Sequence, residues 1–312
     1  MKRNLAASVR ARLLTLAQAR GMIYNQALVR YALEGLLLRL SLSPHADRFI
    51  LKGAMLYVLW KPDAPPRATQ DLDLLCFGPP EPAVCRELFE EIAHLQLNQP
   101  DGLNFDSVQA SPIRLEDLYG GIRVNLTAHL DTARIPLQVD LGFGDRPVPE
   151  ALRLQYPALL REQKPHLRVY AQETVIAEKL HAMVERGLTN SRAKDFFDIS
   201  YLAEHFPFEC PTLSAAIQST FERRGRTLPA AGPIVAWTPQ FYDDPVKQSQ
   251  WAAFLRKTGL SANPLPDVMA QIESFLHLPL SCAQEQQAIP ASWPPGGPWT
   301  SRNSNVHLGK SF

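Results

Sequence analysis

Apolar residues near the start of the chain recur at the spacing of a helix with one buried face. They do so between residues 5 and 20, and again between about residues 26 and 42, after which Pro44 ends the pattern. The next segment, FILKGAMLYVLW (49–60), is typical of a strand that turns into a helix at Lys52–Gly53. A glycine at such a turn allows a phosphate or another backbone segment to approach closely. We therefore expect two helices, followed by a strand and a helix joined at Gly53.

The middle of the chain changes from helical spacing to the two-residue alternation of strands. A strand is predicted over 71–77 and an amphipathic helix over 85–96. The segments 120–131 and 135–145 alternate apolar and polar residues on either side of a short turn. In the second segment the odd-numbered positions from 135 to 141 are apolar, whereas Gln138 and Asp140 share the opposite face. These patterns predict a mixed α/β (α+β) fold around one sheet.

Strand patterns fade after about residue 167, and helical patterns replace them. Helices are predicted at 173–187, 191–206, 212–224, 245–257 and 264–277. The last segment is rich in Pro, Gln, Ser and Gly, so we expect disorder there, although Trp293 and Trp299 could dock on the folded part. The predicted organisation is an α/β lobe over residues 1–167, a helical lobe over 168–280 and a disordered tail over 281–312.

Composition limits the class of protein. The chain has 312 residues, of which 46% are hydrophobic, and this is enough for a large core. Its four cysteines are scattered and lack metal-ligand spacing, so we expect reduced thiols in a cytoplasmic protein and no disulfide framework. The N-terminal residues lack the apolar core of a signal peptide. No apolar stretch approaches the ~20 residues that span a bilayer, so we expect no membrane partner.

The formal net charge of +1 conceals an uneven distribution along the chain. The charged residues up to Arg48 are mostly basic. In the segment 71–150 acidic residues outnumber arginines and lysine is absent, and in the segment 153–194 basic residues predominate again. Basic segments on both sides of an acidic one could hold an anionic polymer around a metal site. Solvated helix faces would produce the same distribution.

The segment RATQDLDLL (67–75) places Asp71 and Asp73 two positions apart in a predicted strand. Side chains at such positions point to the same face, with Cα atoms roughly 6.5–7 Å apart. Aspartate disfavours strands, and two like charges on one face repel each other unless a cation lies between them. Mg²⁺ fits this arrangement because it binds one or two carboxylates and completes its shell with phosphate oxygens and water. The alternative is an exposed amphipathic strand, which has the same pattern.

Asp140 lies on a separate predicted strand, opposite the apolar face of that strand. If this strand neighbours the one that carries Asp71 and Asp73, three carboxylates converge. Such a group can hold two metal ions about 3.5–4 Å apart and stabilise an in-line displacement at phosphorus. The alternative is a solvated Asp140, or one that pairs with Arg146.

Four segments, read in order, resemble a known family. They are RLSLSPHADRFILKGAMLYVLW, RATQDLDLL, LQVDLGFGD and IAEKLHAMVERGLTNSRAKDFFDI. From about Ser8 to Leu202 the chain is similar to the AbiEii/AbiGii family of toxin nucleotidyltransferases, which includes the mycobacterial MenT toxins. The C-terminal third resembles the family only in being helical. The resemblance implies a polymerase-β-like nucleotidyltransferase lobe with a mixed sheet, joined to a C-terminal helical lobe.

The resemblance also implies roles for individual residues. Asp71 and Asp73 would hold the metal ions, Lys179 in AEKLHA would contact the triphosphate of the incoming nucleotide, and Asp195 in KDFFD would be catalytic. The alternative for Lys179 and Asp195 is a structural salt bridge between consecutive helices. Lys52, Gly53 and Arg67 are further candidates to bind the nucleotide, and Glu178, His181, Lys194 and Asp198 have weaker cases.

One position departs from the family pattern. Relatives usually have glycine or serine after the first glycine of the motif, whereas this chain has Ala54. Alanine is small, but it has no hydroxyl and does not favour the left-handed backbone conformation. We therefore expect Gly53, and not Ala54, to line the nucleotide site.

The function implied by the resemblance is that of a toxin in a type IV-like toxin–antitoxin (abortive infection) system. Such an enzyme, with Mg²⁺, would transfer a nucleoside monophosphate from an NTP to an RNA acceptor, for which we expect the 3′ end of tRNA. Asp140 could help to deprotonate the attacking hydroxyl. The implied protein partner is a separately encoded winged-helix antitoxin. Candidate contacts to the RNA backbone are Arg10, Arg12, Lys164 and Arg168.

Two alternatives remain open at this point. The same catalytic lobe could nucleotidylate a protein or a small molecule, because acceptor choice depends on surface shape. A nucleotidyltransferase fold could also bind NTP without turnover, although such a module would have no need to keep Asp71, Asp73, Lys179 and Asp195 together.

Overall fold

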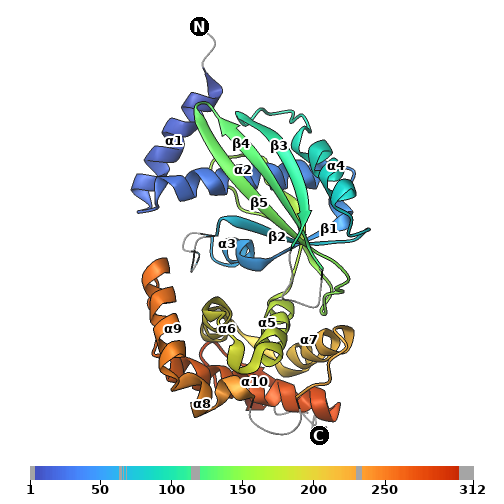
Figure 1. Cartoon of the computed structure of the whole chain (residues 1–312), viewed down its shortest axis with the longest axis vertical. Helices are drawn as coiled ribbons and strands as arrows, with labels where there is room; N and C mark the ends of the chain where they lie inside the picture. The colour runs from blue at the N-terminus through green and yellow to red at the C-terminus, as the bar shows by residue number, and fades with distance from the viewer. Residues whose placement is uncertain are drawn as a thin grey trace, which may run out of the picture. The chain divides into compact units, whose positions relative to one another are not determined.

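A computed structural model gives the fold of the chain over residues 4–62, 65, 67, 69–113, 120–229 and 234–301 (Figure 1). The chain divides into two units. Unit 1 comprises Met1–Arg146 and Ala151–Tyr170, and unit 2 comprises Pro147–Glu150 and Ala171–Phe312. The division at Tyr170–Ala171 falls three residues after the boundary drawn from the sequence at 167/168, and the short segment Pro147–Glu150 belongs to unit 2.

Unit 1 contains helices and strands close to the positions that the apolar patterns predict. Its helices are α1 (Leu5–Ala19), α2 (Tyr24–Leu42), α3 (Leu56–Trp60) and α4 (Pro82–Ala93). Its strands are β1 (Phe49–Lys52), β2 (Asp71–Cys76), β3 (Leu103–Pro112), β4 (Ile122–Leu130), β5 (Ala133–Gly142), β6 (Leu152–Gln155) and β7 (His166–Val169). The segment 49–60 forms the predicted strand and helix, with a short 3₁₀ turn (Gly53–Met55) between them.

The seven strands form one mixed sheet in the order β3-β4-β5-β2-β1-β7-β6. β2 pairs with β5 and β1 pairs with β7 in parallel, and the other neighbours are antiparallel. The predicted mixed α/β fold is therefore confirmed. β3 was not predicted, because a bulge between Asp106 and Gln109 shifts its alternation of apolar and polar residues. β6 and β7 were also missed, since each has only four residues.

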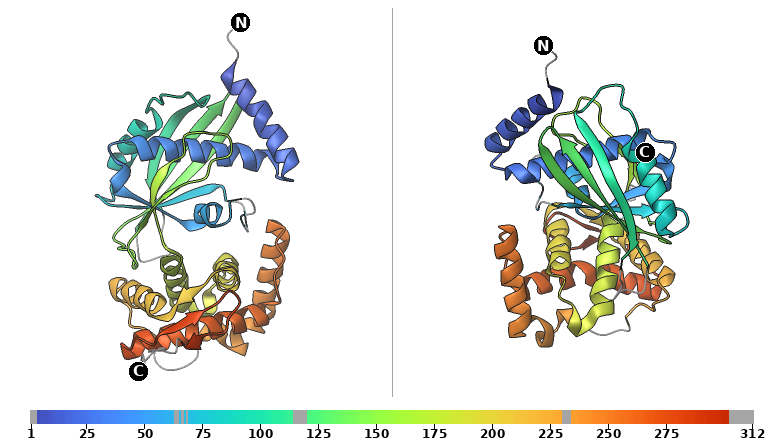
Figure 2. Two further views of the ribbon diagram at one scale, coloured as in Figure 1. Left: turned by 180° about the vertical axis from the view of Figure 1, so that it is seen from behind. Right: turned by 45° about the horizontal axis from the view of Figure 1, so that its top comes forward.

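Helix α2 packs against the sheet at β5 and β7 and against α4, as the two views of Figure 2 show. Its side chains are buried along most of its length, from Ala27 to Leu40. On the strands, the apolar residues predicted to share one face, such as Leu137 and Val139, are buried, at 3% and 0% exposed. The core of unit 1 therefore lies between this helix layer and the sheet.

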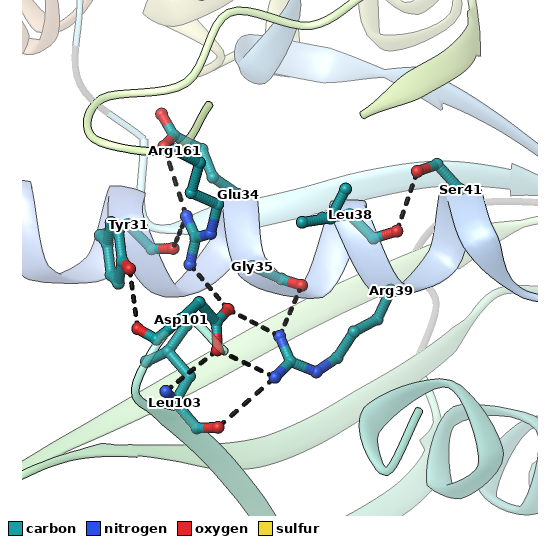
Figure 3. Close-up of polar contacts among 9 residues, drawn as sticks. All are labelled: Tyr31, Glu34, Gly35, Leu38, Arg39, Ser41, Asp101, Leu103 and Arg161. Atoms are coloured by element: carbon teal, nitrogen blue, oxygen red, sulfur yellow. Dashed lines mark hydrogen bonds and ion pairs between the residues drawn. The ribbon is translucent and has the colours of Figure 1, made fainter. Parts of the chain in front are cut away.

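A buried cluster of charges fixes α2 to the rest of unit 1 (Figure 3). Arg39 donates to the two carboxylate oxygens of Asp101 at 2.8 and 3.0 Å, and Arg161 donates to one of them at 3.0 Å. The guanidinium carbon of Arg161 lies 3.7 Å from the centre of the Tyr31 ring. A Cβ atom on Gly35 would lie 2.6 Å from the Arg161 side chain, so the glycine provides the space for it. Removal of either partner of such a buried pair is costly, and the cluster therefore specifies how α2 packs.

Unit 2 is mainly helical, as predicted. Its helices are α5 (Gln172–Arg186), α6 (Ala193–His205), α7 (Cys210–Arg223), α8 (Pro239–Tyr242), α9 (Pro245–Thr258) and α10 (Leu265–Glu285). Helix α5 packs against α6 and α7, and α10 packs against α6, α7 and α8. None of the helices in the described part of the chain is long and apolar enough to cross a membrane. All four cysteines are buried free thiols, in agreement with the absence of a disulfide framework.

The predicted disorder of the tail is wrong for residues 281–301. Helix α10 continues to Glu285, and the strands β9 (Ala291–Trp293) and β10 (Thr300–Ser301) form a small sheet with β8 (Phe208–Glu209). The two tryptophans explain the difference: the indole N–H groups of Trp293 and Trp299 donate to the carbonyl oxygens of Ala203 and Phe275, each at 2.8 Å. Burial of these large rings offsets the entropy cost of ordering a Pro- and Gly-rich segment. Residues 302–312 lie outside the described residues.

Candidate functional site

The predicted aspartates of unit 1 lie on neighbouring strands. β2 and β5 are parallel neighbours, and their register places Asp73 directly beside Asp140 and Asp71 beside Gln138. The three carboxylates therefore share one face of the sheet, because residues side by side on paired strands point the same way. We call Asp71, Asp73 and Asp140 the carboxylate cluster. Asp71 is exposed, and Asp73 and Asp140 are half-buried.

Two basic residues extend this arrangement into a row across four strands. Lys52 on β1 lies directly opposite Asp73, and Arg123 on β4 lies directly opposite Asp140. The Lys52 ammonium is 4.0 Å from an Asp145 oxygen and 5.3 Å from the centre of the Tyr170 ring. Lys52 was predicted to bind the nucleotide because it precedes Gly53, and the strand pairing places it next to Asp73.

Gly53 has a left-handed backbone with φ +70°, as the turn from strand to helix requires. A Cβ atom at this position would lie 2.0 Å from the Oδ2 atom of Asp73, so only glycine leaves room for that carboxylate. The sequence led us to expect a phosphate or another backbone segment beside Gly53, and in the structure the nearest group is this side chain of the carboxylate cluster. Ala54 is 4% exposed.

Arg123 is the residue that sequence reasoning missed. Its Nε and Nη2 atoms donate to the two oxygens of Asp140 at 2.8 and 2.9 Å, which is a bidentate pair. The hydrogen bond to Asp140, and after it the negative charges of Asp140, Asp71 and Asp73, raise the pKa of Arg123 despite partial burial. The polar position of Arg123 in the strand IRVNL was visible in the sequence, but its partner depends on the register between β4 and β5. The alternative pairing of Asp140 with Arg146 is replaced by this one.

The carboxylates of this face differ in how well they fit a metal ion. Among the described residues, no group of three or more His, Cys, Asp or Glu side chains is arranged to hold one. Asp71 and Asp73 still fit Mg²⁺, because this ion needs only one or two carboxylates when phosphate and water supply the other ligands. Asp140 fits less well, since Arg123 already binds both of its oxygens. The structure therefore favours a two-carboxylate site over the three-carboxylate site expected from the sequence.

Arg67 comes from the segment that precedes β2. Its guanidinium carbon lies 5.7 Å from the centre of the Tyr57 ring, a distance typical of a cation–π contact. Tyr57 belongs to α3, which directly follows the Gly53 turn. Arg67 is thus held beside the same turn as Lys52 and Gly53, within unit 1.

The second group of predicted residues lies in unit 2, where α5 and α6 pack against each other. The Lys179 ammonium is 2.7 Å from Asp195 and 2.8 Å from Asp198, and Arg192 is 2.7 Å from the other oxygen of Asp195. The carboxylate side chains of Asp195 and Asp198 are 3% and 0% exposed, and that of Lys179 is 15% exposed. We call Lys179, Asp195 and Asp198 the lysine cluster. It is formed because residues three apart on α6 face the same side.

The lysine cluster keeps its charges although it is buried. Burial by itself would lower the pKa of Lys179, but the attraction of Asp195 and then Asp198 raises it above its ordinary value. Burial would likewise raise the pKa of Asp195, but Lys179 and then Arg192 hold it below the ordinary value. Two cations thus balance two carboxylates. The salt bridge that the sequence left open as an alternative does exist, and it does not exclude a role in nucleotide binding.

The weaker candidates of unit 2 have different environments. His181 packs on the Phe221 ring at 5.0 Å between centroids, and its Nδ1 atom lies 3.3 Å from an Arg224 nitrogen. Burial, and then the charge of Arg224, lower the pKa of His181 to about 4. A Glu178 oxygen is 3.5 Å from the same arginine. Lys194 is exposed on α6. His181, Glu178 and Lys194 are therefore not part of the lysine cluster, whereas Asp198 is.

A family model now identifies the chain. The model described as "Nucleotidyl transferase AbiEii toxin, Type IV TA system" matches residues 35–274, which include both clusters. The chain belongs to this family. It is therefore a nucleotidyltransferase of the AbiEii toxin family, whose substrate is an NTP and whose systems include a separate antitoxin. No curated protein matches the chain.

Two solved structures from Helicobacter pylori are similar to this AbiEii chain. One is described as a nucleotidyltransferase, with 16% sequence identity and a TM-score of 0.49 over 84% of this chain and 96% of that chain. The other is JHP933, with 17% identity and a TM-score of 0.47 over 81% of this chain and 91% of that chain.

Proposed function

We propose that this AbiEii nucleotidyltransferase transfers a nucleoside monophosphate to the 3′-hydroxyl of an RNA acceptor, with tRNA as the expected acceptor. The observation that carries the proposal is the row formed by Lys52, Asp73, Asp140 and Arg123 across one sheet face, with Asp71 on the same face. Within it, Asp71 and Asp73 are the carboxylates suited to Mg²⁺ and Lys52 is the cation suited to phosphate, as phosphoryl transfer requires, whereas Asp140 and Arg123 pair with each other.

Asp71 and Asp73 are the residues that would hold Mg²⁺. When bound there, the ion would supply positive charge to the phosphate oxygens of the NTP. Lys52 places a further positive charge beside Asp73, where it can pair with the triphosphate. Gly53 keeps the Asp73 carboxylate in position, since any larger residue would displace it.

The lysine cluster of unit 2 supplies a second group suited to an anion. An ammonium group has three N–H donors, and Lys179 directs two of them to Asp195 and Asp198. The third can donate to a phosphate oxygen, and the two buried carboxylates fix the direction in which it points. Asp195 would thus act by positioning Lys179, which is a narrower role than the catalytic one expected from the sequence.

In the proposed reaction the 3′-hydroxyl oxygen attacks the α-phosphorus of the NTP. A new P–O bond forms to the acceptor, the bond from the α-phosphorus to the oxygen that bridges it to the β-phosphorus breaks, and pyrophosphate leaves with the bonding electrons. The hydroxyl proton is released to solvent. Asp140 is a weak candidate for this proton, because both of its oxygens accept hydrogen bonds from Arg123.

The test is to incubate the full-length protein with Mg²⁺ and each α-labelled NTP in turn, in the presence of total tRNA and of a cell extract. We expect the label to appear in tRNA and to depend on Mg²⁺. Label in a protein or a small molecule would overturn the RNA acceptor, and binding of NTP without any transfer would overturn the enzymatic proposal. Asp73→Asn should abolish the transfer. Asp106→Asn is the matched control, since Asp106 is a strand carboxylate of the same sheet that pairs with His129 instead.

The family also implies a partner, the antitoxin. We propose, as the resemblance implies, that it is a winged-helix protein encoded separately. Co-expression with the neighbouring gene product should restore growth to cells that express the active toxin, whereas a toxin that is already inactive through Asp73→Asn should allow growth without it.

A further inference from the structure

Unit 1 carries an exposed aromatic ring with arginines around it, at the end of β2 opposite to Asp71. Phe77 directly follows β2, and its N–H donates to the carbonyl oxygen of Arg48 at 2.9 Å, which continues the pairing of β1 with β2. The side chain of Arg48 donates back to the Phe77 carbonyl oxygen at 3.2 Å. A Cβ atom on Gly78 would lie 2.5 Å from the Arg48 guanidinium, so the glycine makes room for it. Phe77 remains 37% exposed.

Two further arginines lie on the neighbouring strands. The guanidinium carbon of Arg168 on β7 is 5.4 Å from the centre of the Phe77 ring. Arg153 on β6 lies directly opposite Arg168 in the antiparallel register. Like charges in this position destabilise a strand pair, and an anion between them would relieve the repulsion. We call Phe77, Arg48, Arg153 and Arg168 the Phe77 patch.

The protein itself supplies part of that negative charge. Arg153 is 2.7 Å from an Asp47 carboxylate oxygen, and Arg168 donates to the Asp47 backbone carbonyl at 2.8 Å. Among the described residues, the contact between Arg153 and Asp47 is the one side-chain ion pair that Arg48, Arg153 or Arg168 forms. The Arg153 and Asp47 side chains are 72% and 76% exposed, and an ion pair this exposed contributes little. Three guanidinium groups thus face one solvated carboxylate, which leaves the patch positive.

The Phe77 patch lies on the same sheet face as the carboxylate cluster. β1 and β7 are parallel with Leu51 beside Val169, so Arg168 lies beside Ile50, whose partner on β2 is Leu75. Leu75 is two residues from Asp73 and therefore shares its face, as Phe77 does if the alternation continues. The contact between Arg168 and the Phe77 ring agrees with this placement. Phe77 is four positions along the chain from Asp73, a distance of roughly 13 Å in an extended strand.

We propose that the Phe77 patch binds a single-stranded segment of the RNA acceptor, with a base stacked on Phe77 and phosphates on Arg48, Arg153 and Arg168. An exposed ring with guanidinium groups beside it is the combination that single-stranded nucleic acids use, because bases stack on aromatic and guanidinium planes while phosphates need positive charge. An acidic protein segment would use the arginines but would leave the ring unexplained. This proposal rests on the proposed function, since it assigns a surface to the RNA acceptor.

Of the basic residues predicted to contact RNA, Arg168 is the one that belongs to the Phe77 patch. Arg10 pairs with Asp131 at 2.9 Å and also donates to Thr132, so it contacts the protein's own side chains. Arg12 and Lys164 are exposed, and neither belongs to the Phe77 patch.

Binding is measured with the full-length protein and without NTP, so that it does not depend on transfer. The probes are a fluorescent single-stranded RNA of mixed sequence, the same sequence as a duplex, and deacylated total tRNA. We expect tighter binding of the single strand than of the duplex. Phe77→Leu should weaken single-strand binding about tenfold, whereas Phe77→Trp should preserve it, because stacking on an aromatic ring is lost in the first variant and kept in the second. Leucine keeps the apolar character, so a merely structural role would show no such difference.

The arginines are tested by the dependence of affinity on salt. The logarithm of the association constant falls linearly with the logarithm of the salt concentration. Arg153→Gln and Arg168→Gln should each make this slope less steep by about 0.7, because each variant removes one phosphate contact to a single strand. Arg256→Gln on α9 is the charge-matched control, and it should leave the slope unchanged; circular dichroism confirms that each variant is folded.

Each outcome decides the proposal. Wild-type affinity in Phe77→Leu and wild-type salt slopes in both arginine variants would overturn the patch, and label transfer to tRNA at the normal rate in those variants would leave the proposed function intact. Label that enters protein in place of RNA, with no RNA binding by the wild type, would overturn both. Loss of antitoxin neutralisation with normal RNA binding in the variants would show that the patch binds the protein partner, and this too would overturn the proposal.

Discussion

The carboxylate cluster of unit 1 and the lysine cluster of unit 2 are both groups of aspartates with basic partners, but they differ in burial. Asp71 is exposed and Asp73 is half-buried on a sheet face, whereas Asp195 and Asp198 are almost fully buried between two helices. A buried charge must be balanced by its own protein, because water cannot stabilise it. An exposed carboxylate has no such constraint and can be offered to a ligand. In the proposed function the same residue type would thus serve the chemistry directly in one unit, whereas in the other it requires a fixed set of partners.

We therefore expect substitutions in the carboxylate cluster to reduce activity with little effect on stability, and substitutions in the lysine cluster to reduce both. The sharpest case is Asp73→Asn, which keeps the shape that fits beside Gly53 but removes the charge. We expect the rate of nucleotide transfer to fall at least about a hundredfold, because metal binding contributes several kcal/mol to such reactions. The free energy of unfolding should change by less than about 1 kcal/mol, since relief of the repulsion from Asp71 and Asp140 offsets the lost attraction to Lys52 and Arg123. Label transfer and urea unfolding measure the two effects, and transfer at the wild-type rate in a folded Asp73→Asn protein contradicts the assignment.

Lys179→Ala should affect both properties. It leaves Asp198 buried without its cation, and loss of one partner of a buried ion pair costs about 3–5 kcal/mol. We expect that loss in the free energy of unfolding of unit 2, together with loss of transfer. The control is the double variant Lys179→Met with Asp198→Asn, in which Arg192 still balances Asp195. It should recover much of the stability and none of the activity; recovery of transfer would show that the lysine acts only in folding.

Gly53→Ala should act on the carboxylate cluster through the backbone. An L-residue with φ near +70° costs roughly 1–2 kcal/mol, and the added Cβ would also displace the Asp73 carboxylate. Gly21 offers a matched control, because its φ is +61° and a Cβ there meets nothing within 4 Å. Gly21→Ala should therefore show a similar loss of stability with normal transfer, whereas Gly53→Ala should lose both. Equal activity of the two variants would mean that the position of Asp73 is not critical.

The smallest effect concerns His181 and pH. Its pKa is lowered to about 4 in the folded protein, from an ordinary value near 6.5, so the unfolded chain binds the proton more readily between these values. Stability should therefore fall as the pH is lowered from about 6.5 towards 4, by on the order of 1–2 kcal/mol at pH 5. Urea unfolding at pH 7.5 and pH 5 should show a smaller decrease in His181→Phe than in the wild type. The exposed His277 provides the control, and His277→Gln should retain the full decrease.

Local pattern was sufficient for much of the fold. Helices α1, α2, α5 and α6 and strands β2, β4 and β5 follow from apolar spacing, because each buries one face over a length that shows its period. The pattern failed where other features dominated. The bulge in β3 shifts its alternation, β6 and β7 are too short to show a period, and two docked tryptophans order a segment whose composition is typical of disorder.

Sequence by itself determined which residues are candidates for the chemistry: the paired aspartates and the glycine before them and, through the family resemblance, the lysine and aspartates on consecutive helices. These are recognisable because their types and spacings are local properties of the chain. Only the tertiary structure decided what each of them contacts. Strand register placed Asp140 beside Asp73 and gave it Arg123 as a partner, and the same register brought Arg168 to the ring of Phe77. Register joins residues that are distant in sequence, so no local pattern contains it.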